Sequence, residues 1–272
     1  MRSTWLVTQI VSATLLCGVS QGQSPSSSPI PETNNQTTAP SIALSPAVIM
    51  IRATPGTSST QTLTITNLTN TRFKFVLEAL DVVVHNGERV FVPAGETDGG
   101  IARSAVFDPA IVELEPGTST QAKITLTVPS APKVRAVVAL FHGQTALPGK
   151  GSFMVTGSLG ALITYNLSDD VALRLGEPSV SLQTDSSNLT VSEELENEGT
   201  EPLIPKGTLA ILNSSGELTG RVAIEPHRLL PGEKFDCAVE YPHSLRPGDY
   251  RAMVSIEHEG GVQTSSVVFD VP

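Results

Sequence analysis

The chain has 272 residues and a formal net charge of −10, and 39% of its residues are hydrophobic, 16% charged and 4% aromatic. The excess of acidic residues argues against a protein that binds nucleic acid through its phosphates, because such proteins need a surplus of Lys and Arg. The combination of 22 Gly and 20 Pro with few charges also argues against helical bundles and coiled coils, which are rich in Ala, Glu, Lys and Leu.

Residues 1–22 have the pattern of a signal peptide. Arg2 supplies a positive charge, and the apolar segment WLVTQIVSATLL that follows is too short to span a bilayer. Small residues after this segment suit cleavage by a signal peptidase. Cys17 offers a second interpretation, a lipoprotein whose cysteine becomes the lipidated first residue, although that signal prefers a small residue where the chain has Leu16. We predict an exported protein of the periplasm or cell surface, with no transmembrane span.

Cleavage of the signal would leave Cys237 as the only cysteine. An internal disulfide is then excluded, and the folded domains must be stable without one. The next segment, residues 23–41, is rich in Ser, Pro, Thr, Asn and Gln. Such a composition cannot bury apolar surface and predicts a disordered linker. It is either a tether that holds the protein away from a membrane or a tail without function.

From residue 42 onward the apolar pattern has a period of two. Clear examples are TLTIT at residues 62–66, QAKITLTV at 121–128 and KFDCAVEY at 234–241. Each predicts a strand with one buried face, while AVVALF at 136–141 predicts a central strand that is covered on both faces. No segment of useful length has a helical apolar period, so we predict an all-β chain.

Four Pro-Gly pairs precede alternating segments, as expected for type II turns in which Pro fixes φ and Gly supplies a positive φ. They begin at Pro55, Pro116, Pro231 and Pro247. The roughly 14 strands that we expect exceed the seven to nine of one immunoglobulin-like sandwich. We therefore predict two consecutive sandwiches, at residues 42–168 and 169–272.

Two residues of the second sandwich have predicted structural roles. Tyr250 follows a Leu and a Pro-Gly turn and opens an alternating strand, which is the pattern of the tyrosine corner of immunoglobulin-like domains; the alternative is an ordinary core tyrosine. Cys237 alternates with Phe235 and Val239, so we interpret it as a small buried side chain rather than a reactive thiol.

The first domain resembles the amino-terminal domain of periplasmic pilus-assembly chaperones of the chaperone–usher type. The segments that carry the resemblance are ALSPAVIMI, PGTSSTQTLTITN, RFKFVLEALDV, IVELEPGTSTQAKITLTV and RAVVALF. The second domain, with LLPGEKF and LRPGDYRAMVSIE, also looks like the WxL-interacting proteins of Gram-positive surfaces. The resemblance implies an immunoglobulin-like fold and a role in binding another exported polypeptide, such as a pilin-like subunit.

In these chaperones a basic pair holds the terminal carboxylate of the pilin, and the last strand of the first domain donates alternating hydrophobic residues. Arg52 is the nearest basic residue to the first predicted strand, and no basic residue lies between Lys150 and Arg174. The donor pattern in the last strand comprises Phe153, Val155, Leu159, Ala161, Ile163 and Tyr165. The alternative interpretation of this pattern is an ordinary core strand.

The sequence contains no pattern of catalytic chemistry. The five His are scattered and have no zinc-ligand spacing, and there is no nucleophile elbow or phosphate-binding loop. The acidic run EELENE at residues 193–198 is typical of a solvated face. We expect no enzyme activity, no cofactor and no metal. The two hypotheses are a chaperone-like protein that binds an exported polypeptide, and a structural or adhesive surface module that binds a cell-wall component or host ligand.

Overall fold

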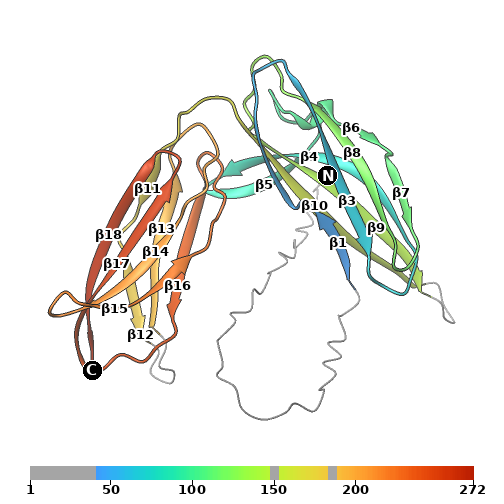
Figure 1. Cartoon of the computed structure of the whole chain (residues 1–272). Helices are drawn as coiled ribbons and strands as arrows, with labels where there is room; N and C mark the ends of the chain where they lie inside the picture. The colour runs from blue at the N-terminus through green and yellow to red at the C-terminus, as the bar shows by residue number, and fades with distance from the viewer. Residues whose placement is uncertain (1–40, 148–152, 183–188) are drawn as a thin grey trace, which may run out of the picture.

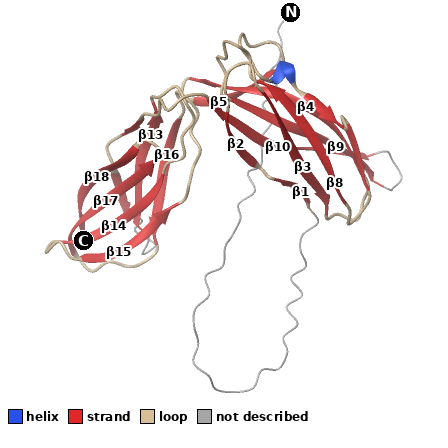
Figure 2. Ribbon diagram, turned by 45° about the horizontal axis from the view of Figure 1, so that its top comes forward, coloured by secondary structure: helices blue, strands red, loops and turns tan. Residues whose placement is uncertain are grey.

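The structure is a computed structural model that describes residues 41–147, 153–182 and 189–272, with backbone alone at residues 146, 147 and 153–155 (Figure 1). The predicted signal peptide, the Cys17 lipidation site and nearly all of the predicted linker fall on residues 1–40, outside this part. Apart from one short 3-10 turn, η1 (Ala102–Ser104), the regular elements of the described residues are all strands (Figure 2). The prediction of an all-β chain is confirmed. No helix of the described residues is long and apolar enough to cross a membrane.

The first domain is a sandwich of two sheets. One sheet has the strand order β1-β3-β8-β6 and the other has the order β2-β10-β9-β4-β5, with β7 paired to a different part of β4. The strands of the first sheet are β1 (Ile42–Ser45), β3 (Ser58–Asn67), β6 (Val106–Asp108) and β8 (Ser119–Thr127). Those of the second are β2 (Val48–Arg52), β4 (Phe73–His85), β5 (Glu88–Pro93), β7 (Ile111–Leu114), β9 (Ala136–Leu147) and β10 (Phe153–Asn166).

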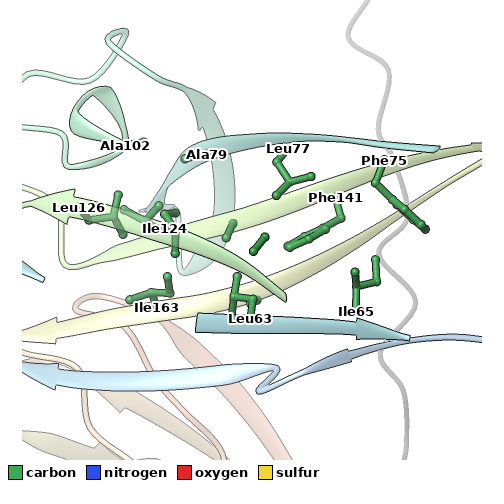
Figure 3. Packing of buried hydrophobic residues seen from close by; sticks show 14 of the residues in the cluster. Leu63, Ile65, Phe75, Leu77, Ala79, Ala102, Ile124, Leu126, Phe141 and Ile163 are labelled. Atoms are coloured by element: carbon green, nitrogen blue, oxygen red, sulfur yellow. The ribbon is translucent and has the colours of Figure 1, made fainter. Parts of the chain in front are cut away.

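The alternating residues of the two sheets meet between them and form the core of the first domain (Figure 3). Ala122, Ile124 and Leu126 of β8 are buried, as their alternation predicts, and they pack with Leu63 of β3. From the facing sheet, residues such as Phe75, Leu77, Phe141, Ile163 and Tyr165 complete this core. Burial of apolar side chains from both sheets is the main force that holds a sandwich of this kind together.

The second domain is a smaller sandwich. In one sheet β13 pairs with β11 and β12 on one side and with β16 on the other, and the facing sheet has the order β15-β14-β17-β18. The strands of the first are β11 (Leu173–Leu175), β12 (Ser179–Leu182), β13 (Leu189–Asn197) and β16 (Lys234–Tyr241). Those of the second are β14 (Lys206–Asn213), β15 (Leu218–Ile224), β17 (Gly248–His258) and β18 (Gly261–Val271).

Both residues with a predicted structural role lie in this second sandwich. The Tyr250 hydroxyl donates to the backbone oxygen of Arg246 at 3.0 Å, the contact that a tyrosine corner makes with upstream backbone. Cys237 is buried in the core of the domain. Burial, with the nearby charge of Glu193, raises the pKa of its thiol to about 11, and a thiol with such a pKa is a poor nucleophile.

The two sandwiches lie at an angle to each other and meet near β5 (Figures 1 and 2). Leu230 of the second domain is buried in a small cluster with Val82, Ala136 and Val138, on the outer face of the first domain's larger sheet. Two ion pairs cross the contact, each with an Arg from the first domain and a Glu from the second: Arg89–Glu233 at 2.7 Å and Arg135–Glu201 at 3.2 Å.

Candidate functional site

The candidate site is the edge of β10, the last strand of the first domain. On one side β10 pairs with β9 over most of its length, from Phe153 to Thr164. On the other side β2 pairs only with the end of β10, from Leu162 to Asn166. Within the described residues, no strand pairs with this second side between residues 156 and 161. We call this stretch the open edge.

The hydrogen-bonding directions along β10 show which backbone groups lie at the open edge. The Tyr165 amide donates to Arg135, toward β9, whereas the Leu162 amide donates to Ala47, toward β2. Successive residues of an antiparallel pair alternate in this way. The N–H and C=O groups of Thr156, Ser158 and Gly160 therefore point outward along the open edge, in line with the groups that bind β2 further along.

The open edge also lacks the charges that usually protect a sheet edge. Native edge strands use charged residues, Pro or bulges to discourage pairing with another chain. β10 has no charged residue and no Pro between Phe153 and Asn166. The other edge strands of five or more residues all carry charges: β2, β5, β15, β16 and β18. The longest strand of the described residues thus has an unprotected edge.

Among the predicted donor residues, the described side chains of Leu159 and Ile163 differ in burial. Phe153 and Val155 lie opposite Leu147 and Thr145 in the β9–β10 pairing, and their side chains lie outside the described part. Leu159 is partly buried and packs against the first core from the open edge. Ile163 is fully buried in that core, at a position where β10 is paired on both sides, so it is a core residue.

Arg52, the predicted anchor for a carboxylate, ends β2 and forms an ion pair with Asp169 at 2.6 Å. The two side chains are 69% and 84% exposed, so water competes with this pair and it contributes little to stability. The pair joins the first domain to the segment that leads into the second. Arg52 is accessible, but in the described structure it already has a carboxylate partner.

A second arginine near β10 was missed by the sequence analysis. Arg228 of the second domain donates a hydrogen bond to the Thr164 hydroxyl of β10, and its Nε is buried without an acceptor. Burial and the neighbouring Arg89 lower the pKa of Arg228, although Glu259 acts in the opposite direction. Only the contact between the domains brings Arg228 to β10, so no local sequence signal points to it.

A polar row crosses the outer face of the sheet beside the open edge. His142 is hydrogen bonded through Nδ1 to Ser158 Oγ at 2.8 Å and through Nε2 to Glu78 Oε1 at 2.6 Å. The three residues resemble a hydrolytic triad in composition. However, the His142 and Glu78 side chains are 42% and 48% exposed on an open sheet face, whereas catalysis of this kind needs an enclosed site with oxyanion donors. We interpret the row as a cross-strand network.

The acidic run at residues 193–198 divides between core and surface. Glu194 and Glu196 of β13 and Glu198 just after it form ion pairs with Arg174 of β11. Lys234 also lies close to Glu194 and Glu196, so two basic residues face these three carboxylates. Glu193 points inward, where its carboxylate accepts a hydrogen bond from Ser265 at 2.8 Å. Among the described residues, no group of three or more His, Cys, Asp or Glu side chains is arranged to hold a metal ion.

Comparison with known proteins finds similar chains among the solved structures. No protein-family model and no curated protein matches the sequence. The class 5 fimbriae chaperone CfaA is similar over 85% of this chain and 100% of its own, with 16% identity and a TM-score of 0.43. The YadV chaperone matches 84% of this chain and 99% of its own, with 13% identity and a TM-score of 0.42.

The E. coli chaperone DraB is a third similar structure, with 17% identity, 86% of this chain and 98% of its own covered, and a TM-score of 0.37. Similarity at these identities and TM-scores does not assign a function to this chain. Any function must therefore be argued from the edge strands and contacts of this chain itself.

Proposed function

We propose that this chain is a non-enzymatic exported protein that binds an extended segment of another exported or surface polypeptide along the open edge of β10. The observation that carries the proposal is the uncharged stretch between residues 156 and 161, whose outer side pairs with no strand of the part of the chain that the structure describes. A sheet edge of this kind offers a row of backbone donors and acceptors, and a strand from another chain satisfies them by adding to the sheet.

Side chains on both faces of β10 fit this mode of binding. Leu159 faces the core side and Ser158 the outer side, so an added strand would meet apolar neighbours on one face and polar neighbours on the other. An amphipathic strand with alternating residues satisfies both faces. Phe153 and Val155 continue the alternation of Leu159 in the sequence, and we include them in the proposed binding strand. Ile163 contributes to it only by supporting the core.

We include Arg52 as a contact for an acidic group of the partner. Its guanidinium is largely exposed at the end of β2, and a carboxylate of the partner would have to replace Asp169 there. This exchange costs little because the existing pair is open to solvent. Export to the periplasm or cell surface is part of the same proposal, and rests on the signal-like sequence of residues 1–22.

The variant Ser158→Pro tests the proposed mode of binding. The Ser158 amide points to the open edge and takes no part in the β9 pairing, so Pro removes an outward donor without removing a bond of the sheet. Ser158→Ala is the matched control, because it loses the hydroxyl contact with His142 but keeps the amide. Each form would be expressed in the envelope of its source organism and cross-linked, and the bound species identified by mass spectrometry.

We expect the wild type and Ser158→Ala to cross-link to the same exported polypeptide, and Ser158→Pro to lose it while remaining folded by circular dichroism. Equal capture by Ser158→Pro would contradict binding at the open edge. Recovery of a cell-wall glycan in place of a polypeptide, unchanged in all three forms, would instead favour a surface module that binds the wall.

A further inference from the structure

The polar row of Ser158, His142 and Glu78 reaches the open edge of β10 through Ser158. Ser158 lies opposite His142 in the β9–β10 pairing and is exposed. Its backbone N–H and C=O point outward, so a strand that pairs with the open edge places one residue directly opposite Ser158 on the same face of the sheet. Directly opposite residues of an antiparallel pair have Cβ atoms about 4.5–5.5 Å apart. The Ser158 hydroxyl is therefore within reach of a polar side chain of the added strand.

The carboxylate of Glu78 determines which nitrogen of His142 carries a hydrogen. An ionised carboxylate has only acceptor atoms, so the Nε2 atom of His142, at 2.6 Å from Glu78 Oε1, is the donor. In a neutral imidazole the other nitrogen, Nδ1, has no hydrogen and accepts. The Ser158 hydroxyl, at 2.8 Å from Nδ1, then donates to it. Only the lone pairs of the hydroxyl oxygen are left for a bound strand.

Protonation of the imidazole reverses the bond at Ser158. Both ring nitrogens carry hydrogens in the charged form. Nε2 keeps its bond to the Glu78 carboxylate, whereas Nδ1 now donates to the Ser158 oxygen. The hydroxyl hydrogen is released and becomes available to an acceptor of the bound strand. Histidine is the side chain that ordinarily changes charge between about pH 5 and 8.

Few other charged groups face this imidazole. On its β10 side there is none, because β10 has no charged residue. On its β4 side, Lys74 is exposed on the same face as Glu78, and Glu113 of β7 lies opposite Lys74. Of the described residues, only Glu78 and Ser158 are hydrogen bonded to the ring. A change of charge at His142 is therefore transmitted to the open edge through Ser158.

We propose that His142 sets the hydrogen-bonding character of the Ser158 hydroxyl, and thereby selects the side chain that the bound strand carries opposite Ser158. With a neutral imidazole the hydroxyl takes a donor of the strand, such as a Thr hydroxyl or an Asn amide. With a protonated imidazole it also takes a side chain that can only accept. The inference rests on the proposed function, since a strand must pair with β10 to place a side chain there. Ser158 is then the specificity-determining residue, and His142 is a positioning residue that orients its hydrogen.

The test uses rhodamine-labelled synthetic peptides in which Val alternates with a guest residue, either Ala or Nγ,Nγ-dimethylasparagine. The alternation places a guest residue opposite Ser158 in every register that keeps Val on the core side. The side chain of dimethylasparagine accepts hydrogen bonds but has none to donate, and it carries no charge. The protonated imidazole therefore does not attract it as an ion, and the ratio of the two affinities isolates the effect of the hydroxyl.

Binding to the full chain is measured by fluorescence anisotropy at about pH 5 and about pH 8, on either side of the range in which histidine titrates. The proteins are the wild type, His142→Gln, Ser158→Ala and Ser158→Pro. The matched control is His85→Gln, which removes an exposed histidine at the end of β4, away from β10.

One net hydrogen bond changes an equilibrium constant by roughly twofold to tenfold. We expect the preference of the wild type for the dimethylasparagine peptide over the Ala peptide to be roughly threefold or more greater at about pH 5 than at about pH 8. His85→Gln should show the same change. In His142→Gln and Ser158→Ala the preference should stay constant between the two pH values, and Ser158→Pro should bind neither peptide.

Two outcomes would overturn the inference and leave the proposed function standing. One is a wild-type preference that does not change with pH, and the other is a change that persists in Ser158→Ala, in each case with binding lost in Ser158→Pro. If Ser158→Pro binds like the wild type, or neither peptide binds the wild type at either pH, the proposed function fails together with the inference.

Discussion

Glu201 provides the sharpest test of how the two domains are held together. Its carboxylate is 1% exposed and accepts hydrogen bonds from the Leu167 amide at 2.9 Å and the Ser168 hydroxyl at 3.0 Å. It also pairs with Arg135 at 3.2 Å, whose side chain is 18% exposed. Leu167 and Ser168 lie between β10 and β11, so this single carboxylate joins the first domain, the connecting segment and the second domain. The informative change is Glu201→Ala.

The expected cost can be worked from these contacts. Removing one partner of a buried ion pair costs roughly 3–5 kcal/mol, because the remaining charge stays buried and unpaired. Arg135 is not fully buried and keeps a hydrogen bond to the Pro132 oxygen at 3.0 Å, which favours the lower end. We therefore expect Glu201→Ala to reduce the free energy of unfolding by about 3 kcal/mol.

The assay is urea denaturation followed by circular dichroism on the wild type, the two single variants at Glu201 and Arg135, and their double variant. The double variant should lose less than the sum of the singles, because it leaves no unpaired charge. The control is Arg52→Ala, whose exposed pair with Asp169 should contribute less than about 1 kcal/mol. If Glu201→Ala costs no more than this control, the carboxylate does not hold the domains together.

Two substitutions and one labelling experiment test the second domain. Burial raises the pKa of Glu193 above its ordinary value of 4.5, so the folded domain keeps a proton that the unfolded chain releases at lower pH. The loss of folding stability caused by burying the Glu193 carboxylate is thus absent below about pH 4.5 and grows as the pH rises through the folded-state pKa. Glu193→Gln should therefore raise the thermal unfolding temperature relative to the wild type at about pH 8 but not at about pH 4. An equal difference at both pH values would contradict this. Tyr250→Phe removes the bond to Arg246 and should cost about 1 kcal/mol in urea denaturation; unchanged stability would show that the corner contributes nothing. The thiol of Cys237, with its pKa of about 11, should react with a thiol reagent only as fast as the domain opens, so rapid labelling of the native protein at about pH 8 would refute its burial.

Much of the fold could be predicted from local patterns because strands and turns are local features. The alternation around Ile124 correctly predicts a half-buried strand, and the run at 136–141 predicts a central strand, which is β9 between β10 and β4. The Leu, the Pro-Gly pair and the Tyr at residues 245–250 predict a bond from the phenol to upstream backbone. In each case the residues that form the feature are close in the sequence.

The site could be predicted only in part, because it depends on pairings between distant segments. The alternation of β10 is visible in the sequence, but it does not show that β2 covers only the end of the strand. Arg52 has a partner 117 residues away in the sequence, and Arg228 reaches Thr164 only because the domains pack together. Likewise, the sequence presents Gly143, Gly157 and Gly160 as equivalent. In the structure a Cβ would overlap Phe75 at Gly143 and Val138 at Gly160, whereas at Gly157 it would meet no atom of the described residues within 4 Å.

The difference between Gly157 and the other two glycines, which packing requires, also bears on function. Elsewhere in the two sandwiches, the Pro-Gly turns, the alternation of the strands discussed above and the charges of the longer edge strands agree with the observed structure, as expected of a sequence that specifies one structure. The open edge departs from this agreement twice, since it lacks protective charges and contains Gly157, where a Cβ would meet no atom of the described residues within 4 Å. Either departure alone would weaken the domain or favour aggregation. Their coincidence on a few residues of one strand is best explained if a strand of another chain completes the sheet there, because that strand would satisfy the outward backbone groups and cover the exposed position at Gly157.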